Sequence, residues 1–188
     1  ASARAPSCKN NLRQIGLATQ QFCDIHRGEL PDWWHAGIVK GERSWIYTLA
    51  LHLENVDAIR VCPDDVLADE RLRNRATSYV INNYLTTLEV DSVRNLRQVM
   101  TTSRTIETME IADRLPAKPE NEHTHSTDWF APLNIHDGVV LEEIQREVQI
   151  DRHQQSAHYL YLDGHVETIG ATQIGQWAAD GYDFAKPQ

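Results

Sequence analysis

Nine histidines are spread through this chain of 188 residues, and imidazole nitrogens together with carboxylate oxygens are common ligands of transition metals. His123, His125 and Asp128 lie within six residues of one another and are the candidate metal ligands. Residues 116–126, PAKPENEHTHS, have the composition of a loop. Because histidines in loops are usually just exposed to solvent, we expect no bound metal and no cofactor, with these three residues as the site to check.

Other imidazole and carboxylate groups could also supply ligands: His136 with Asp137, and His153, His158 and His165 near Asp163. A hairpin that places Leu162 opposite His165 also places His158 opposite Ile169. His158 and His165 would then lie on one face of the sheet but far apart along it. This register argues against a shared metal site.

The sequence contains none of the short motifs that mark common catalytic sites: no G-x-S-x-G elbow, no H-E-x-x-H and no phosphate-binding G-x-x-x-x-G-K-[ST] loop. A Cys-His nucleophilic pair is formally available through Cys62. A cysteine directly before Pro63, with no supporting residues nearby, is more typical of a structural role. We therefore expect no catalytic residue and no enzymatic activity, although carboxylate pairs depend on the fold.

Two loops offer alternative binding chemistry. Clustered carboxylates could bind a hard divalent cation, but they lack EF-hand spacing, so a solvated acidic loop is the expectation; they are Asp64, Asp65, Asp69 and Glu70. Trp33, Trp34 and Trp45 could form an aromatic ligand site. Tryptophan more often covers apolar surface, and we expect that role here.

The three cysteines are too few for a disulfide scaffold. If residues 8–27 form a helix, Cys8 and Cys23 are about 22 Å apart, because the rise is about 1.5 Å per residue. A disulfide requires Cα atoms within about 7 Å. Cys62 therefore pairs with Cys8, with Cys23 or with neither, and the spacing alone leaves these alternatives open.

The composition limits the possible partners. The net charge of −9 argues against nucleic acid and against purely electrostatic binding to anionic lipid. No run of eighteen apolar residues is present, so no segment of this sequence is expected to span a membrane. We expect residues 1–188 to form a single domain, and the start at Ala1 instead of Met suggests a trimmed chain.

The element that must organise these groups is an amphipathic helix over residues 8–27, CKNNLRQIGLATQQFCDIHR. Its apolar positions recur every three or four residues: Cys8, Leu12, Ile15, Ala18, Phe22 and Ile25. Gly28 can adopt the left-handed cap and Pro31 cannot continue the helix, so both predict its end. An apolar stripe of this length needs a broad surface, and we expect a β-sheet beneath it.

The remaining periodicities predict strands at residues 78–85 and 103–111 and a hairpin at residues 158–169. Asp163-Gly164 between the two halves of the hairpin is typical of a two-residue type I′ turn. Further predicted elements are helices at residues 44–54, capped by Ser44, and at 139–148 and 171–179, an extended piece at 58–62, and a short helix or turn at 90–100.

Three stretches carry a family resemblance. His153 is followed by nine residues and then Asp163-Gly164, which resembles the H-X9-DG signature of a large bacterial family of prepilin-type, pseudopilin-like proteins of unassigned function. Residues 8–22 are similar to the segment that follows that family's apolar N-terminal helix. VCPDD, residues 61–65, resembles its C-P-S-D element, with Asp64 where serine is usual. Residues 113–149 match nothing in the family pattern.

The resemblance implies a pilin-like α+β fold, in which a long N-terminal helix packs on an antiparallel sheet with extra short helices and loops. It also implies a cleavable leader and an apolar helix before Ala1, exposure outside the cytoplasm, and a Cys8–Cys62 disulfide that leaves Cys23 free. As a physical reason for the signature, we expect His153 to fold back and hydrogen-bond a carboxylate or carbonyl near the hairpin.

On these grounds we expect a non-enzymatic subunit of a secretion or pilus-like assembly. It would be anchored in the inner membrane, with its globular part in the periplasm or outside the cell. Its partners would be other pilin-like subunits or secretion-system proteins, and not nucleic acid. The alternatives are a secreted metal-binding or metal-dependent hydrolytic domain built on the histidine-rich loop, and a periplasmic ligand-binding module built on the tryptophan-rich loop.

Overall fold

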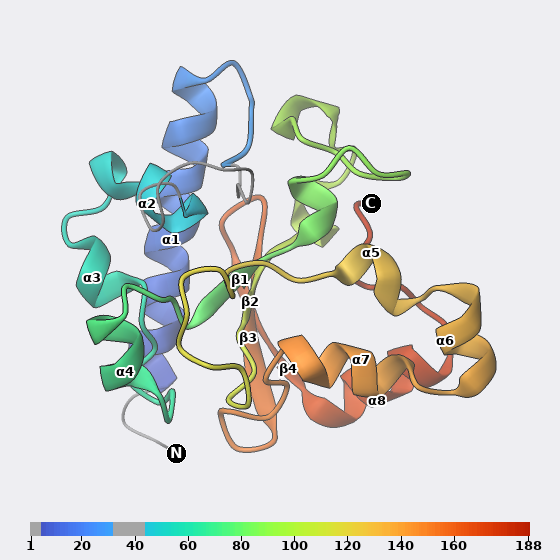
Figure 1. Cartoon of the computed structure of the whole chain (residues 1–188). Helices are drawn as coiled ribbons and strands as arrows, with labels where there is room; N and C mark the ends of the chain where they lie inside the picture. The colour runs from blue at the N-terminus through green and yellow to red at the C-terminus, as the bar shows by residue number, and fades with distance from the viewer. Residues whose placement is uncertain (1–4, 32–43) are drawn as a thin grey trace.

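The computed structural model describes residues 5–31 and 44–188 and is shown in Figure 1. Its longest element is helix α1, Ala5–Ile25, which confirms the helix predicted from residues 8–27 with small shifts at both ends. Arg27 and Gly28 follow with φ angles of 57° and 92°, so the chain leaves the helix where the glycine predicted. Within the described residues, no helix is both long enough and apolar enough to cross a bilayer.

The described residues form one four-stranded sheet, antiparallel throughout, in the order β1-β2-β3-β4. The strands are β1 (Tyr79–Ile81), β2 (Ile106–Glu110), β3 (Ser156–Tyr161) and β4 (Val166–Gly170). This confirms the predicted α+β, pilin-like class: a long N-terminal helix on an antiparallel sheet with short helices and loops around it.

The other α-helices are short: α2 (Trp45–Thr48), α3 (Val56–Ile59), α4 (Ala68–Arg73), α5 (Ser126–Trp129), α6 (Pro132–Asp137), α7 (Val140–Glu147) and α8 (Ala171–Ala179). Short 3-10 turns lie at η1 (Ala50–His52), η2 (Asn83–Leu85), η3 (Leu96–Gln98) and η4 (Thr102–Arg104). Helices α7 and α8 match their predicted segments, and β2 lies within its predicted strand. η3 lies in the segment predicted as a short helix or turn.

Three predicted elements are wrong in detail. The strand predicted at residues 78–85 is a strand only over β1, and its second half forms η2. The helix predicted at residues 44–54 is divided into α2 and η1, and the side chain of Ser44 makes no capping hydrogen bond. The extended piece predicted at residues 58–62 begins instead inside α3. The side chain of Asn55 caps that helix by accepting a hydrogen bond from the amide of Ala58 at 3.2 Å. A single capped turn this short has no periodicity that the sequence could reveal.

The sheet is covered on both faces (Figure 1). On one face α1 places Leu12 and Ile15 in a core cluster with Leu160 of β3. On the other face α7 and α8 contribute Ile144 and Ile174 to a second cluster. All residues of β2 are therefore buried, although its alternating sequence resembles a half-exposed strand. The predicted apolar stripe of α1 is buried as far as Ala18, whereas Phe22 is half-buried and Ile25 is 68% exposed.

The hairpin has a different register from the one predicted. His158 pairs with Thr168, and the amide of Tyr161 bonds the carbonyl of His165 at 3.0 Å, so the loop contains three residues. Only Gly164 has a positive φ, of 88°, which fits a type I turn followed by a left-handed glycine better than type I′. The one-residue shift places His158 and His165 on opposite faces of the sheet.

The tip of this hairpin packs closely against α1. A Cβ atom on Gly16 of α1 would lie 2.8 Å from the Leu160 side chain and 3.1 Å from the Cα atom of Gly164. A Cβ atom on Gly164 would lie 3.0 Å from the side-chain nitrogen Nε2 of Gln20. The helix and the turn can therefore approach this closely only because each presents a glycine to the other.

Candidate functional site

The three sequence motifs meet at one buried place between α1 and the sheet. Cys8 of α1 forms a disulfide with Cys62, with the two Cα atoms 4.9 Å apart, which is the pair that the resemblance implied. Cys23, further along α1, is buried and free. His153 comes from the segment before β3, and its Nε2 atom lies 4.0 Å from the sulfur of Cys62.

The residue that joins these motifs is Glu110, at the end of β2, which sequence reasoning did not identify. Its side chain is fully buried, and its Oε1 atom lies 2.9 Å from Nε2 of His153. Its Oε2 atom accepts a hydrogen bond from the amide of His158 at 2.9 Å. The only sequence signal was the presence of a carboxylate in a predicted strand.

His153 is held on both sides of its ring. Besides the Glu110 contact, its Nδ1 atom lies 3.2 Å from Oδ2 of Asp64, and the ring stacks on His158 with centroids 4.2 Å apart. Burial lowers the pKa of His153, but the hydrogen bond and charge of Glu110 and the charge of Asp64 outweigh it, so its pKa lies above 6.5. These are the carboxylate contacts that the signature histidine was expected to make.

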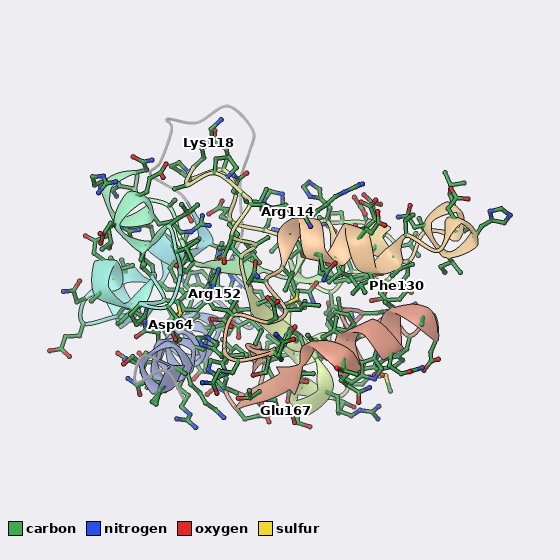
Figure 2. The ribbon with its side chains drawn as sticks, turned by 90° about the horizontal axis from the view of Figure 1, so that it is seen from below. Asp64, Arg114, Lys118, Phe130, Arg152 and Glu167 are labelled. Carbon is green, nitrogen blue, oxygen red and sulfur yellow. A yellow bond between two sulfur atoms is a disulfide. The ribbon has the colours of Figure 1, made fainter. Side chains whose placement is uncertain are left out.

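Two buried arginines compensate for the carboxylates around this histidine. Arg152 donates to the carbonyl of Ile111 at 2.7 Å, forms an ion pair with Asp113, and lies 4.0 Å from Glu110. Arg71 forms an ion pair with Asp65 at 2.7 Å, and Arg152 lies 3.9 Å from Asp65. Figure 2 shows Asp64 beside α1 and Arg152 nearer the centre of the molecule.

The prediction of a solvated acidic loop is therefore wrong for Asp65, whose side chain is fully buried. Burial raises the pKa of Asp65, but Arg152 and Arg71 reverse that effect and its pKa lies below the usual 3.8. Other carboxylates of this region, Asp57, Asp64 and Asp69, line an open groove of about 980 Å³ beside α4. Asp64 thus belongs both to the groove and to the buried contact with His153.

The candidate metal ligands His123, His125 and Asp128 are not brought together as a site. Among the described residues, the group of metal-type side chains that converges is Cys8, Cys62, Glu110 and His153. Nδ1 of His125 instead lies 2.5 Å from Glu147 of α7, and this hydrogen bond raises the pKa of His125 although burial opposes it. The rings of His123 and His125 lie close together, with centroids 5.0 Å apart, but among the described residues they are not part of a converging group of three or more metal-type side chains.

The remaining candidates have structural positions. Trp45 is fully buried and its indole donates to the carbonyl of Glu122 at 2.8 Å, whereas Trp33 and Trp34 lie outside the described residues. His136 contacts its neighbour Asp137 at 2.9 Å on the surface. The sulfur of Cys62 is in the disulfide, so it is not the thiol that a Cys-His nucleophilic pair would need.

A second buried carboxylate lies between α1 and β2. Glu107 is 1% exposed, and its Oε1 atom accepts a hydrogen bond from the hydroxyl of Thr19 at 2.7 Å. Burial raises the pKa of Glu107 from 4.5 to about 8, and the Thr19 hydrogen bond offsets this only in part. The carboxyl group is thus held largely neutral at the helix-sheet interface at neutral pH.

Residues 1–92 match a protein family that is described as a protein of unknown function (DUF1559). The match includes α1, both cysteines of the disulfide and Asp64, whereas Glu110, His153 and the Asp163-Gly164 turn lie beyond it. No curated protein and no solved structure matches the chain. The H-X9-DG signature therefore remains a resemblance in the sequence.

Proposed function

We propose that this chain is the globular part of a non-enzymatic, pilin-like subunit that assembles with like subunits outside the cytoplasm. Three features support the proposal: the long amphipathic helix on an antiparallel sheet, the family match of residues 1–92, and the disulfide. Disulfides are typical of compartments outside the cytoplasm and rare within it. Attachment to the inner membrane through an apolar segment before Ala1 is part of the same proposal.

The observation that carries the proposal is the two-sided character of α1. Its inner face is buried against β3 and β4, and its outer face is a stripe of exposed residues that recur every three or four positions: Asn10, Arg13, Leu17, Gln21 and Asp24. Leu17 is 57% exposed in the middle of this stripe, between a cation and an anion. Opposite charges on the two sides of Leu17 in this outward stripe suit contacts between copies of the same helix.

A structural role also fits the buried polar cluster. Cys8, Cys62 and Glu110 are fully buried, so no substrate can reach them without opening the fold. The cluster joins α1, the segment after α3, β2 and the start of β3 through a disulfide, hydrogen bonds and ion pairs. We infer that in the oxidised protein the signature residues hold the helix on the sheet.

The two alternative functions have less support from the described residues. A hydrolytic metal site in the histidine-rich loop would need at least three converging ligands, and the converging group among the described residues does not include His123, His125 or Asp128. A ligand-binding module would be favoured by an aromatic pocket, but the groove beside α4 is lined mainly by acidic and aliphatic residues.

Cysteine cross-linking in cells that produce the full-length protein tests the proposal. Leu17→Cys places a thiol on the outer face of α1, and Leu133→Cys, on the exposed helix α6, is the matched control. With a short bifunctional thiol reagent, Leu17→Cys should give a ladder of multimers in the membrane or filament fraction, and the control should give little. A protein that stays monomeric in both variants and fractionates with the cytoplasm would contradict the proposal.

A further inference from the structure

We propose that the same buried cluster becomes a zinc site when the Cys8–Cys62 disulfide is reduced. One ligand atom from each of Cys8, Cys62, Glu110 and His153 lies within 4.8 Å of all the others. The four residues come from α1, the segment after α3, β2 and the segment before β3, so the folded chain, and not a local motif, brings them together. This inference does not depend on assembly into a filament.

The donor set suits zinc. Two thiolates, an imidazole and a carboxylate are ligands that Zn²⁺ binds in tetrahedral sites, at about 2.3 Å for sulfur and roughly 2.0–2.2 Å for nitrogen and oxygen. Ligand atoms in such a tetrahedron are about 3.3–3.8 Å apart. Nε2 of His153 is now 4.0 Å from the Cys62 sulfur and 2.9 Å from Glu110. Side-chain shifts of about 1 Å, with separation of the two sulfurs, would therefore complete the site.

Contacts through non-coordinating atoms already orient the ligands. While Nε2 of His153 faces the cluster, its Nδ1 atom contacts Asp64 at 3.2 Å. A carboxylate behind the second ring nitrogen is the usual outer contact of a zinc-bound histidine. Likewise, Oε2 of Glu110 is held by the amide of His158, which leaves Oε1 directed at His153 and the sulfurs.

The surrounding charge also fits a bound cation. Two thiolates and one carboxylate leave a net charge of −1 around Zn²⁺, and the guanidinium of Arg152, 4.0 Å from Glu110, balances it. Such compensation matters because an unbalanced charge in a buried site is costly. Asp64 also lines the acidic groove with Asp57 and Asp69, so the negative potential there would concentrate cations beside His153.

The chemistry makes the disulfide and the metal mutually exclusive. A dithiol or phosphine reductant supplies two electrons, the sulfur-sulfur bond breaks, and two protons give the thiols of Cys8 and Cys62. Binding of Zn²⁺ then displaces both thiol protons and any proton on Nε2 of His153. The oxidised protein would hold the disulfide and no zinc at this place, and the reduced protein would hold zinc.

Titration of the reduced protein with Co²⁺ and then Zn²⁺ tests the inference. Phosphine-reduced protein should bind one Co²⁺, with a thiolate-to-cobalt charge-transfer band and the strong visible absorption of tetrahedral cobalt, and Zn²⁺ should displace it. The oxidised protein should show neither signal. Glu110→Gln, His153→Gln and Asp64→Asn should each weaken zinc binding by about 10- to 100-fold.

Matched controls separate this site from zinc captured by thiols or histidines elsewhere. Cys23→Ser removes the other cysteine and His165→Gln removes a hairpin histidine outside the cluster, and both should bind Co²⁺ like the wild type. Circular dichroism follows the fold throughout. If reduction unfolds the metal-free protein, one equivalent of Zn²⁺ should restore the native spectrum.

Three results would overturn the inference. The first is no stoichiometric metal binding by the reduced protein, whether it is folded or unfolded. The second is equal affinity in wild type, Glu110→Gln and His153→Gln, which would indicate binding by the thiols alone. The third is the same Co²⁺ spectrum with the disulfide intact, which would place the metal elsewhere.

Discussion

Glu110 is the residue on which the buried cluster depends most. Its two oxygens contact the ring of His153 and the backbone of His158, while the guanidinium of Arg152 lies 4.0 Å away. A buried carboxylate in this position is stable only while its partners stay in place, since removing one partner leaves charge or lone pairs uncompensated. The signature histidine therefore matters mainly through the carboxylate it contacts.

We predict that His153→Ala lowers the free energy of unfolding of the oxidised protein by about 3 kcal/mol, because Glu110 and Asp64 both lose a buried partner. For a chain of this size the melting temperature should fall by roughly 6–12 °C. Differential scanning calorimetry measures the change. His165→Ala, at a partly exposed hairpin position, is the control and should shift the melting temperature much less. An unchanged melting temperature in His153→Ala would refute the prediction.

The same variant should change the pH dependence of stability. Because the pKa of folded His153 lies above 6.5, its stabilising contribution is complete below pH 6.5 and is lost as the pH rises through the folded value. The stability difference between wild type and His153→Ala should therefore be greatest below pH 6.5 and narrow at higher pH. A stability difference that widens as the pH rises would show that protonated His153 does not stabilise the fold.

In contrast to His153→Ala, the substitution Glu107→Gln should raise the free energy of unfolding. The folded state retains a proton on Glu107 up to about pH 8, whereas the unfolded state loses it near 4.5, so wild-type stability falls as pH rises between these values. Each pH unit between these two pKa values changes the free energy of unfolding by about 1.4 kcal/mol. The variant keeps an acceptor for Thr19 and should be more stable than wild type by a few kcal/mol at pH 8.

Urea denaturation at pH 5, 6.5 and 8 measures this effect. Glu120→Gln, at an exposed position, is the control and should follow the wild-type curve. If Glu107→Gln has the same pH slope as wild type, the carboxyl group is ionised in the fold and the argument from its burial fails.

Glu110 also illustrates what the sequence could and could not predict at this scale. His153 was expected to contact a carboxylate or a carbonyl near the hairpin. Its actual partners lie 43 and 89 positions away in the chain, at Glu110 and Asp64. Side chains so far apart in sequence are brought together by strand pairing and by the disulfide, and no local pattern encodes those contacts.

At the scale of elements, the long periodic segments were predictable and the short ones were not. Helices α1, α7 and α8 have a clear apolar periodicity, and the sequence located each of them. Single-turn helices such as α3 and α5 have no such pattern. The hairpin was located, but Asp163-Gly164 is compatible with both a two-residue and a three-residue loop, so its register was missed by one residue.

The close packing of α1 on the hairpin predicts opposite effects for two glycine substitutions in helices. Gly16→Ala should destabilise the protein by about 1–3 kcal/mol, because the new methyl group meets Leu160 at 2.8 Å and the Gly164 backbone at 3.1 Å. Gly175→Ala in α8 has its nearest neighbour at an ordinary 3.8 Å, from Leu141. It should stabilise the protein by about 0.5–1 kcal/mol through helix propensity.

Thermal denaturation of both variants separates the packing effect from propensity, because each gains the same helix preference. A stabilised Gly16→Ala would mean that the hairpin tip can move away from α1 at little cost. A destabilised Gly175→Ala would point to a constraint on α8 that its open surroundings do not show.

At the scale of the whole molecule, the sheet separates two layers that are built from different parts of the sequence. The layer formed by α1 lies within residues 1–92, which match the family, and the opposite layer is built by α5, α7 and α8 (Figure 1). Residues 113–149, which match nothing in the family pattern, thus supply much of the second cover of the sheet. Val140 and Ile144 of this segment belong to the core cluster on that face, which explains why β2 is buried on both faces.

The disulfide should contribute about 4 kcal/mol to the stability of the whole chain. Its cysteines are 54 positions apart, and the loss of loop entropy from the unfolded state predicts this value. Urea denaturation with and without a phosphine, in buffer with a metal chelator, measures the contribution without interference from zinc. Cys23→Ser should respond to the reductant as the wild type does, and a midpoint unaffected by reduction would contradict the prediction.

The same covalent link has a mechanical consequence. When the molecule is pulled by its two ends, tension passes directly from Cys8 to Cys62, and the chain between them bears no load. The fully stretched oxidised chain should then be shorter than the reduced one by roughly 190 Å, at about 3.6 Å per residue. If a subunit is pulled along its N-terminal helix, the force would reach the middle of the fold directly, without first detaching that helix from the strands.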